Sequence, residues 1–426
     1  MNRRSTNLRG LLIAGSLSYL AACSEDISSQ AGSEFNPDNI GNNTSTPSVI
    51  ADTFNQQALL ENLVDNIITP TYQDFLTQAQ TQQETINTYC GLEQNHNDGD
   101  DRQAIETALS DSQSQWLTTT NQWQLAEVMQ IGPLTTNSST LRNNIYSWPV
   151  ISHCGIDQDI LFFQNGFINT TPYEITQRTS TRRGLDAAHY LLFNPSLEHS
   201  CTTQRDILDT WPTLSDQQRR VARCEFAVEV ATDITASAQT LNDEWAIFSQ
   251  TLKNAGELNN DFDDVHDGVN AVTDALFYID SIVKDKKIGT PLGLFTNNCG
   301  GVGSICIDDV ESALSDQSIS HLIQNLTAFQ KLFTGQGIDE TNTVGFDDYL
   351  TDVNDQSTSD NIIASTQKAI DDLTAYQVSL SQRLTTDATA VEATHSNVKD
   401  ITDQMKADFI NSLALSLPST AAGDND

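Results

Sequence analysis

Positive charge is what the sequence most lacks. Only 21 Lys and Arg residues stand against 57 Asp and Glu, which gives the 426 residues a formal net charge of −36. Such a charge repels nucleic acid and anionic membrane surfaces, and it concentrates cations near the protein. We therefore expect no nucleic-acid partner. Solubility is the favoured explanation of the acidity, and a dedicated acidic site is the alternative.

Apolar runs long enough to span a membrane are also lacking. The run "LLIAGSLSYL" (residues 11–20) is too short to span a bilayer as a helix, and it follows a start that carries three arginines. It ends at "LAAC" (residues 20–23), which looks like a bacterial lipobox. This pattern predicts a signal peptide over residues 1–22 and a lipid on Cys23. Because Ser24 rather than Asp follows, we expect an outer-membrane lipoprotein that faces the periplasm.

No CxxC pair and no Cys/His cluster occurs, which argues against a structural zinc site. Six cysteines remain besides Cys23. An even number in an exported, oxidising compartment indicates three disulfides, although six cysteines can pair in many ways. The spacings favour pairing in sequence order, as Cys90–Cys154, Cys201–Cys224 and Cys299–Cys306.

Segments of alternating apolar and polar residues are scarce, whereas apolar residues at three-to-four spacing recur along the chain. This pattern predicts an all-α fold of two helical bundles, over residues 51–235 and 236–414. Residues 23–50 are rich in Ser, Asn, Gly and Pro and should form a flexible tether, and residues 415–426 a disordered tail. Pro70 should kink or divide the first long helix. Further helices are predicted at residues 102–129, 158–165, 184–193, 215–252, 262–284, 307–334, 357–384 and 386–413.

Several sequence landmarks resemble those of the imelysin-like family, in the same order. They are "IGPL" (131–134), "YSWP" (146–149), "RRGLDAAHYLLF" (182–193), "KIGTPLG" (287–293) and "ESALSDQSISHLIQNLTAFQKLFTG" (311–335). The resemblance implies two helical bundles arranged as an internal duplication. It also implies a periplasm-facing, often lipid-anchored protein linked to bacterial iron uptake. Some relatives are classed as metallopeptidases.

The family signature is G-x-H-x-x-E, and this chain departs from it. Gly184 matches the glycine, Asp186 takes the histidine position and His189 takes the glutamate position. No HxxE occurs anywhere in the sequence. Asp186 and His189 lie on one face of the predicted helix and could both bind iron or another divalent metal. A hydrogen-bonded polar pair that fixes helix packing is the favoured alternative.

Two arginines precede this motif. Arg182 and Arg183 could bind a carboxylate or another anionic ligand. Salt bridging within a very acidic protein is the favoured alternative for both.

A second set of candidates lies in the second half of the chain. Glu311, Ser312, Ser315 and Ser318 are at helical spacing and could line a cleft between the bundles. The serines could equally allow two helices to approach closely, and Glu311 could be a helix-start carboxylate. Five further histidines share no spacing and are expected on the surface or in the core: His153, His199, His266, His321 and His395.

These observations predict a non-catalytic binding or accessory protein of bacterial iron uptake. Its partners would be the membrane, through the lipid on Cys23, and an iron species or outer-membrane uptake proteins. The alternative is a metal-dependent peptidase with an altered motif, with Asp186 and His189 as metal ligands. No G-x-S-x-G turn supports a serine hydrolase.

Overall fold

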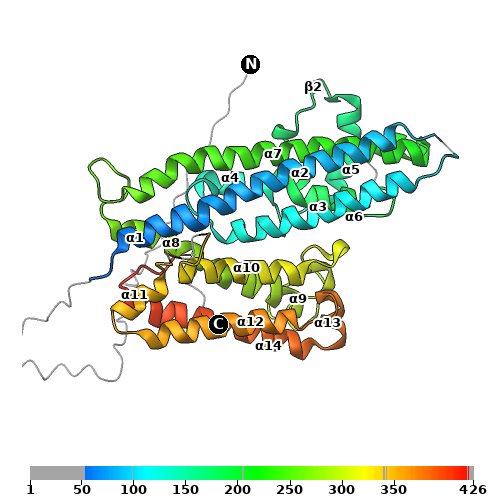
Figure 1. The fold of residues 1–426 in the computed structure, drawn as a ribbon. Helices are drawn as coiled ribbons and strands as arrows, with labels where there is room; N and C mark the ends of the chain where they lie inside the picture. The colour runs from blue at the N-terminus through cyan, green and yellow to red at the C-terminus, as the bar shows by residue number, and fades with distance from the viewer. Residues whose placement is uncertain are drawn as a thin grey trace, which may run out of the picture. The chain divides into compact units, whose positions relative to one another are not determined.

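The chain is an all-α protein, as the sequence predicts, in the residues that the computed structural model describes (Figure 1). These are residues 53–97, 99–203, 206–338, 341, 343–419 and 421. The predicted signal peptide, Cys23 and the tether lie outside them. Among the described residues, no helix is both long enough and apolar enough to cross a membrane.

The first bundle is built around α2, which packs against α7 and α3, while α6 packs against α7 and α3 in turn (Figure 1). Its elements are α1 (Gln56–Asn62), a π-helix (Leu63–Ile68), α2 (Thr69–Gln94), α3 (Gln103–Val128), α4 (Thr136–Ile145), α5 (His153–Asn165), α6 (Gly184–Phe193) and α7 (Asp216–Lys253). A short antiparallel hairpin of β1 (Phe167–Ile168) and β2 (Thr171–Pro172) follows α5.

The second bundle centres on α10, α12 and α14, and α10 also packs against α3 of the first bundle. Its elements are α8 (Val265–Leu276), a π-helix (Ile279–Gly289), α9 (Thr290–Leu292), α10 (Ser318–Thr334), α11 (Phe346–Asp352), α12 (Gln356–Thr374), α13 (Leu380–Thr386), α14 (Ala388–Gln404), a further π-helix (Met405–Phe409) and α15 (Ile410–Ser412). The internal duplication of the two bundles stays a prediction.

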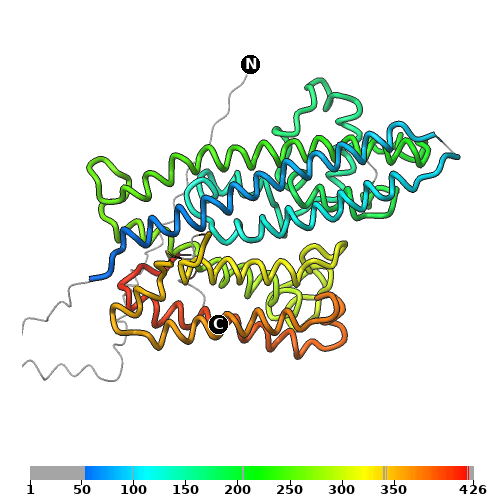
Figure 2. The backbone as a smooth tube through the Cα atoms, in the orientation of Figure 1, coloured from blue at the N-terminus to red at the C-terminus, as the bar shows by residue number. Residues whose placement is uncertain are grey.

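Pro70 divides the first helix less sharply than the sequence suggests. It lies in the first turn of α2, directly after the π-helical turn of Leu63–Ile68. Proline has no amide hydrogen to donate to the carbonyl of Asn66, four residues earlier, and this carbonyl accepts instead from the Ile338 amide at 3.0 Å. The backbone changes its hydrogen-bonding pattern before Pro70 but runs on from α1 into α2 without a break (Figure 2).

The predicted boundary between the bundles, at residues 235 and 236, falls inside α7. This helix starts at a capping box formed by Ser215 and Gln218. Past the predicted boundary it still contacts the first helices, since Asn242 donates to the Tyr72 carbonyl and Trp245 to Thr69. The first bundle therefore retains α7 beyond residue 236.

The predicted helix over residues 307–334 is wrong in its first third. Residues 307–317 form short turns, and α10 begins only at Ser318. Ser312 and Asp316 have positive φ angles of 50° and 56°, which an α-helix does not accommodate. As a result Glu311, Ser312, Ser315 and Ser318 do not share one helical face.

Two of the three predicted disulfides are wrong. The structure pairs Cys90 with Cys224 and Cys154 with Cys201, and only the predicted Cys299–Cys306 bond is confirmed. Cys90 lies on α2 and Cys224 on α7, two helices that run side by side although they are far apart in sequence. Proximity in space, rather than sequence order, therefore decides the pairing.

Part of the predicted disordered tail is packed against the second bundle. Leu415 and Ala421 are buried, and the Ser416 amide donates to the Asn270 side chain. Leucine and alanine that are removed from water in this way stabilise the ordered state.

Candidate functional site

The start of α6 approaches the end of α4 so closely that only glycine fits there. Gly184 has a φ of +77°, and a Cβ at this position would lie 2.5 Å from the carbonyl oxygens of Asn144 and Ile145. The glycine of the signature therefore sets the position of α6 and, through it, of the two residues that follow in the motif.

Asp186 is held by the loop that precedes α5. Its Oδ2 accepts hydrogen bonds from the amides of Ser147 and Trp148, both at 2.8 Å, and from the Ser147 hydroxyl at 3.2 Å. Burial raises the pKa of Asp186 to about 7, against the opposing effect of these donors. Asp186 thus fixes the loop at Ser147 and Trp148 against α6.

His189 stacks on Trp116 of α3, with ring centroids 4.5 Å apart. Its Nε2 lies 3.0 Å from the hydroxyl of Ser315, which belongs to the turns before α10. Burial, together with His321 and His153, lowers the pKa of His189 to about 3. The imidazole is therefore neutral at physiological pH and joins the two halves of the chain.

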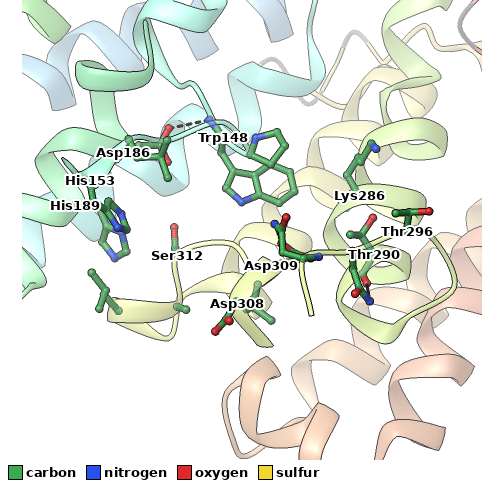
Figure 3. A pocket seen from close by; sticks show the side chains of 17 residues that line it. Trp148, His153, Asp186, His189, Lys286, Thr290, Thr296, Asp308, Asp309 and Ser312 are labelled. Carbon is green, nitrogen blue, oxygen red and sulfur yellow. Dashed lines mark hydrogen bonds between the residues drawn. The ribbon is translucent and has the colours of Figure 1, made fainter. Parts of the chain in front are cut away.

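A cavity of about 530 Å³ opens beside Asp186 and His189. Figure 3 shows these two residues and His153 on one side, Lys286 and Thr290 on the other, and Ser312 between them. The remaining wall comes from Trp148, Pro149, Ile151, residues 296–298, residues 308–310, Ala313 and Leu314. The elements that line it come from both bundles, and Asp186, His189 and Ser312 are the predicted site residues that lie in its wall.

Behind this cavity lies a buried ionic cluster around Glu311, whose side chain is 1% exposed. A Glu311 carboxylate oxygen lies 3.0 Å from the Lys287 ammonium and accepts a hydrogen bond from the Tyr146 hydroxyl at 2.6 Å. The other oxygen lies 3.4 Å from His321 Nδ1. Burial would raise the pKa of Glu311, but Lys287, His321 and the hydrogen bonds outweigh it and hold the pKa well below its usual range.

Lys287 ties this cluster to both bundles. Its ammonium donates to Gln124 of α3 at 2.5 Å and to Asn325 of α10 at 2.9 Å, and lies 3.5 Å from Glu127. Its side chain is 1% exposed. A buried ammonium with two carboxylates and two amide oxygens is fully partnered, which is the condition for keeping such a charge inside a protein.

The two arginines before the motif do not line the cavity. Arg182 pairs with Asp159 at 3.0 Å, and Arg183 forms a buried pair with Asp233. Both arginines therefore form the salt bridges that the sequence favours as the alternative to anion binding. Ser318 is also buried and donates to the Glu311 carbonyl instead of facing the cavity.

Sequence reasoning missed several residues of the site. Trp116, Tyr146 and Lys287 were not singled out, and His153 was expected on the surface or in the core although it lines the cavity. Lys287 carried one usable signal, because lysine is rare in this chain and this one opens the "KIGTPLG" landmark. Trp116 carried none, since nothing local distinguishes it from an ordinary core tryptophan.

The residues present do not fit a resident metal centre. Within the described ranges, no group of three or more His, Cys, Asp and Glu side chains is arranged to hold a metal ion. Asp186 and His189 supply two donors, and each already has one atom in a hydrogen bond to protein. Catalytic zinc sites use about three protein ligands, and structural ones about four.

His189→Gln should reduce the acid sensitivity of the fold. The folded protein keeps His189 neutral down to a pKa of about 3, whereas the unfolded chain takes up a proton below about 6.5. The stability contributed by neutral His189 is therefore fully present above about pH 6.5. It is lost as the pH falls from about 6.5 toward 3, because the unfolded chain then binds a proton that the folded protein does not. In urea titrations from pH 6.5 to 4, the slope of the unfolding free energy should fall by up to about 1.4 kcal/mol per pH unit. His266→Gln, away from the cavity, is the control, and an unchanged slope in the His189 variant would contradict the argument.

Comparison with known proteins gives a consistent match. The family model of imelysin, peptidase family M75, matches residues 68–407. An imelysin-like protein of Psychrobacter arcticum has a TM-score of 0.61 and 16% identity, and the match covers 85% of this chain and 96% of that one. A protein of Parabacteroides distasonis, described as a putative iron-regulated protein A precursor, has a TM-score of 0.61 and 17% identity, with 84% and 94% covered. No curated protein matches the sequence.

Proposed function

The chain belongs to the imelysin family, and from this premise we propose that it is a non-catalytic ligand-binding component of bacterial iron uptake. The observation that carries the proposal is the cavity of about 530 Å³ that Asp186 and His189 line. Its volume falls within the range of about 300–1,000 Å³ that is typical of ligand pockets. The iron-regulated name of the Parabacteroides relative supports the link to iron.

The state of the two motif residues favours binding over catalysis. Hydrolysis at a metal centre needs a metal with an open position and a base that activates water. His189, with its pKa lowered to about 3, is too weak a base for that task at neutral pH. Asp186 uses Oδ2 to fix the loop at Ser147 and Trp148, which leaves only Oδ1 for other chemistry.

The protein would act at the outer membrane, anchored through a lipid on Cys23 and facing the periplasm. The three disulfides agree with an oxidising compartment. Outer-membrane uptake proteins are the expected partners. The net charge of −36 disfavours nucleic acid.

Thermal unfolding with added ligands tests the proposal. We expect an iron species to raise the melting temperature, because a ligand at 100 times its dissociation constant stabilises the folded state by about 2.7 kcal/mol. The panel comprises ferrous and ferric ions, haem and soluble ferric chelates, with zinc for comparison. His189→Ala should reduce the shift, and His266→Ala should keep it. No shift with any form of iron would overturn the proposal.

The alternative is a metal-dependent peptidase, which the family model itself favours because it describes a peptidase family. It requires chelator-sensitive cleavage of a protein such as casein that is abolished by Asp186→Ala and by His189→Ala. Purified protein with no such cleavage, after incubation with zinc or iron, would exclude it.

A further inference from the structure

The cavity offers too few donors for a bare metal ion. Asp186 binds three donors through Oδ2, and the Nε2 of His189 is bonded to Ser315. These two residues leave one carboxylate oxygen and one imidazole nitrogen. His153, Asp308 and Asp309 also line the cavity, but no three of the His, Cys, Asp and Glu side chains among the described residues are grouped to hold a metal ion. Any metal that binds here must therefore bring most of its own ligands.

The cavity is also far larger than an ion requires. Its volume of about 530 Å³ could hold a small organic molecule. The wall combines apolar surface from Trp148 and Ile151 with the hydroxyl groups of Thr296 and Ser312. Such a mixture suits an organic ligand that presents both hydrocarbon and polar edges.

The charges that face the cavity are more negative than positive. Asp308 and Asp309 line it, against one cation of the wall, Lys286. Asp309 is held by the backbone and side-chain amides of Asn298, whereas the Asp308 carboxylate is exposed. The net charge of the chain, −36, adds to this potential. Anionic ligands are therefore disfavoured relative to neutral or cationic ones.

From the donor shortage, the volume and the charge, we infer that the cavity takes iron as a preformed organic chelate, neutral or cationic, rather than as a bare ion. This inference rests on the proposed iron-related function. The chelator fills the coordination sphere of the iron and contacts the wall of the cavity. Trp148 and the hydrogen-bonding groups would contact the organic part of the chelate. Asp308 would attract a chelate with a positive charge.

Isothermal titration calorimetry of the full mature chain tests the inference with five probes. They are ferric and ferrous ions, ferric citrate and haem as anionic complexes, and ferrioxamine B, a trihydroxamate complex with one positive charge. Metal-free desferrioxamine B is the ligand control. We expect ferrioxamine B to bind at one per chain, and the bare ions and the anionic complexes to bind at least about tenfold more weakly.

Two variants locate the binding. Asp308→Lys should weaken the binding of ferrioxamine B by about tenfold, because it reverses a charge that faces the cavity. Asp316→Lys is the matched control, because Asp316 is an exposed acid of the same segment outside the cavity wall. Its dissociation constant for ferrioxamine B should stay within about twofold of that of the parent protein. Ala313→Trp, which fills the cavity from an exposed position, should abolish binding while the melting temperature is retained.

The outcomes separate this inference from the proposed function. Stoichiometric binding of bare iron that is lost in the Asp186→Ala/His189→Ala double variant would overturn the chelate inference and leave the iron-related function standing. Equal binding of metal-free desferrioxamine B, or equal effects of the two aspartate variants, would also overturn the inference. Failure of every iron form would remove both.

Discussion

Replacing Lys287 with Met should lower the free energy of unfolding by about 3–5 kcal/mol, because it leaves buried carboxylates without their cation. Glu311 and Glu127 lie 3.0 and 3.5 Å from the Lys287 ammonium, and their side chains are 1% and 0% exposed. Arg142 still pairs with Glu127, so the uncompensated charge falls mainly on Glu311. Urea unfolding at pH 7.5, followed by circular dichroism, measures the loss.

The neighbouring residue supplies the control for this prediction. Lys286→Met removes the same charge from an exposed position and should change the unfolding free energy by less than about 0.5 kcal/mol. Adding Glu311→Gln to Lys287→Met should recover part of the loss, since the double variant no longer buries an unpaired charge. If Lys287→Met were as stable as the parent protein, the buried cluster would not be holding the two bundles together.

How much the sequence could predict depends on how local the cause of each feature is. The predicted helix 184–193 matches α6, and those at 102–129 and 215–252 match α3 and α7 to within about a residue at each end. Apolar spacing and capping act within a few residues, so these elements can be predicted from sequence. The pairing of Cys90 with Cys224 depends instead on the contact between α2 and α7, which no local pattern specifies.

The same limit applies to the site. Asp186 and His189 stand out in the sequence because they occupy the positions of a family signature. Their actual partners, Ser147 and Ser315, lie 39 and 126 residues away and could not be predicted. Residues 307–317 are predicted as helix because helical apolar spacing continues through them, whereas the chain has positive φ angles at Ser312 and Asp316, which apolar spacing does not reveal. The local sequence pattern is therefore enough to predict most of the helices. The residues of the site are brought together by the packing of the bundles, which the local pattern does not specify.

Gly184→Ala should lower the free energy of unfolding by on the order of 4 kcal/mol, among the largest effects expected of a single substitution. An alanine there must adopt a φ of +77° and place its Cβ 2.5 Å from two backbone oxygens, which cannot move without shifting the end of α4. Gly166→Ala is a closely matched control, because Gly166 has a φ of +75° and a Cβ added there would meet nothing within 4 Å. It should lose only about 1–2 kcal/mol, the cost of the left-handed backbone alone. Thermal and urea unfolding of the two variants measure the difference, and equal losses would contradict the role of close packing.

The comparison of the Gly184 and Gly166 variants also shows whether the glycine of the signature is needed for packing or for the chemistry of the site. If Gly184→Ala is destabilised far more than Gly166→Ala, the glycine is required by the contact between α6 and α4, whatever the cavity binds. A glycine at this position is then expected in any chain that packs these helices in the same way, including one with Asp186 and His189 in place of the usual His and Glu. The match at Gly184 is therefore support for the fold, and support for metal chemistry must come from the residues that line the cavity.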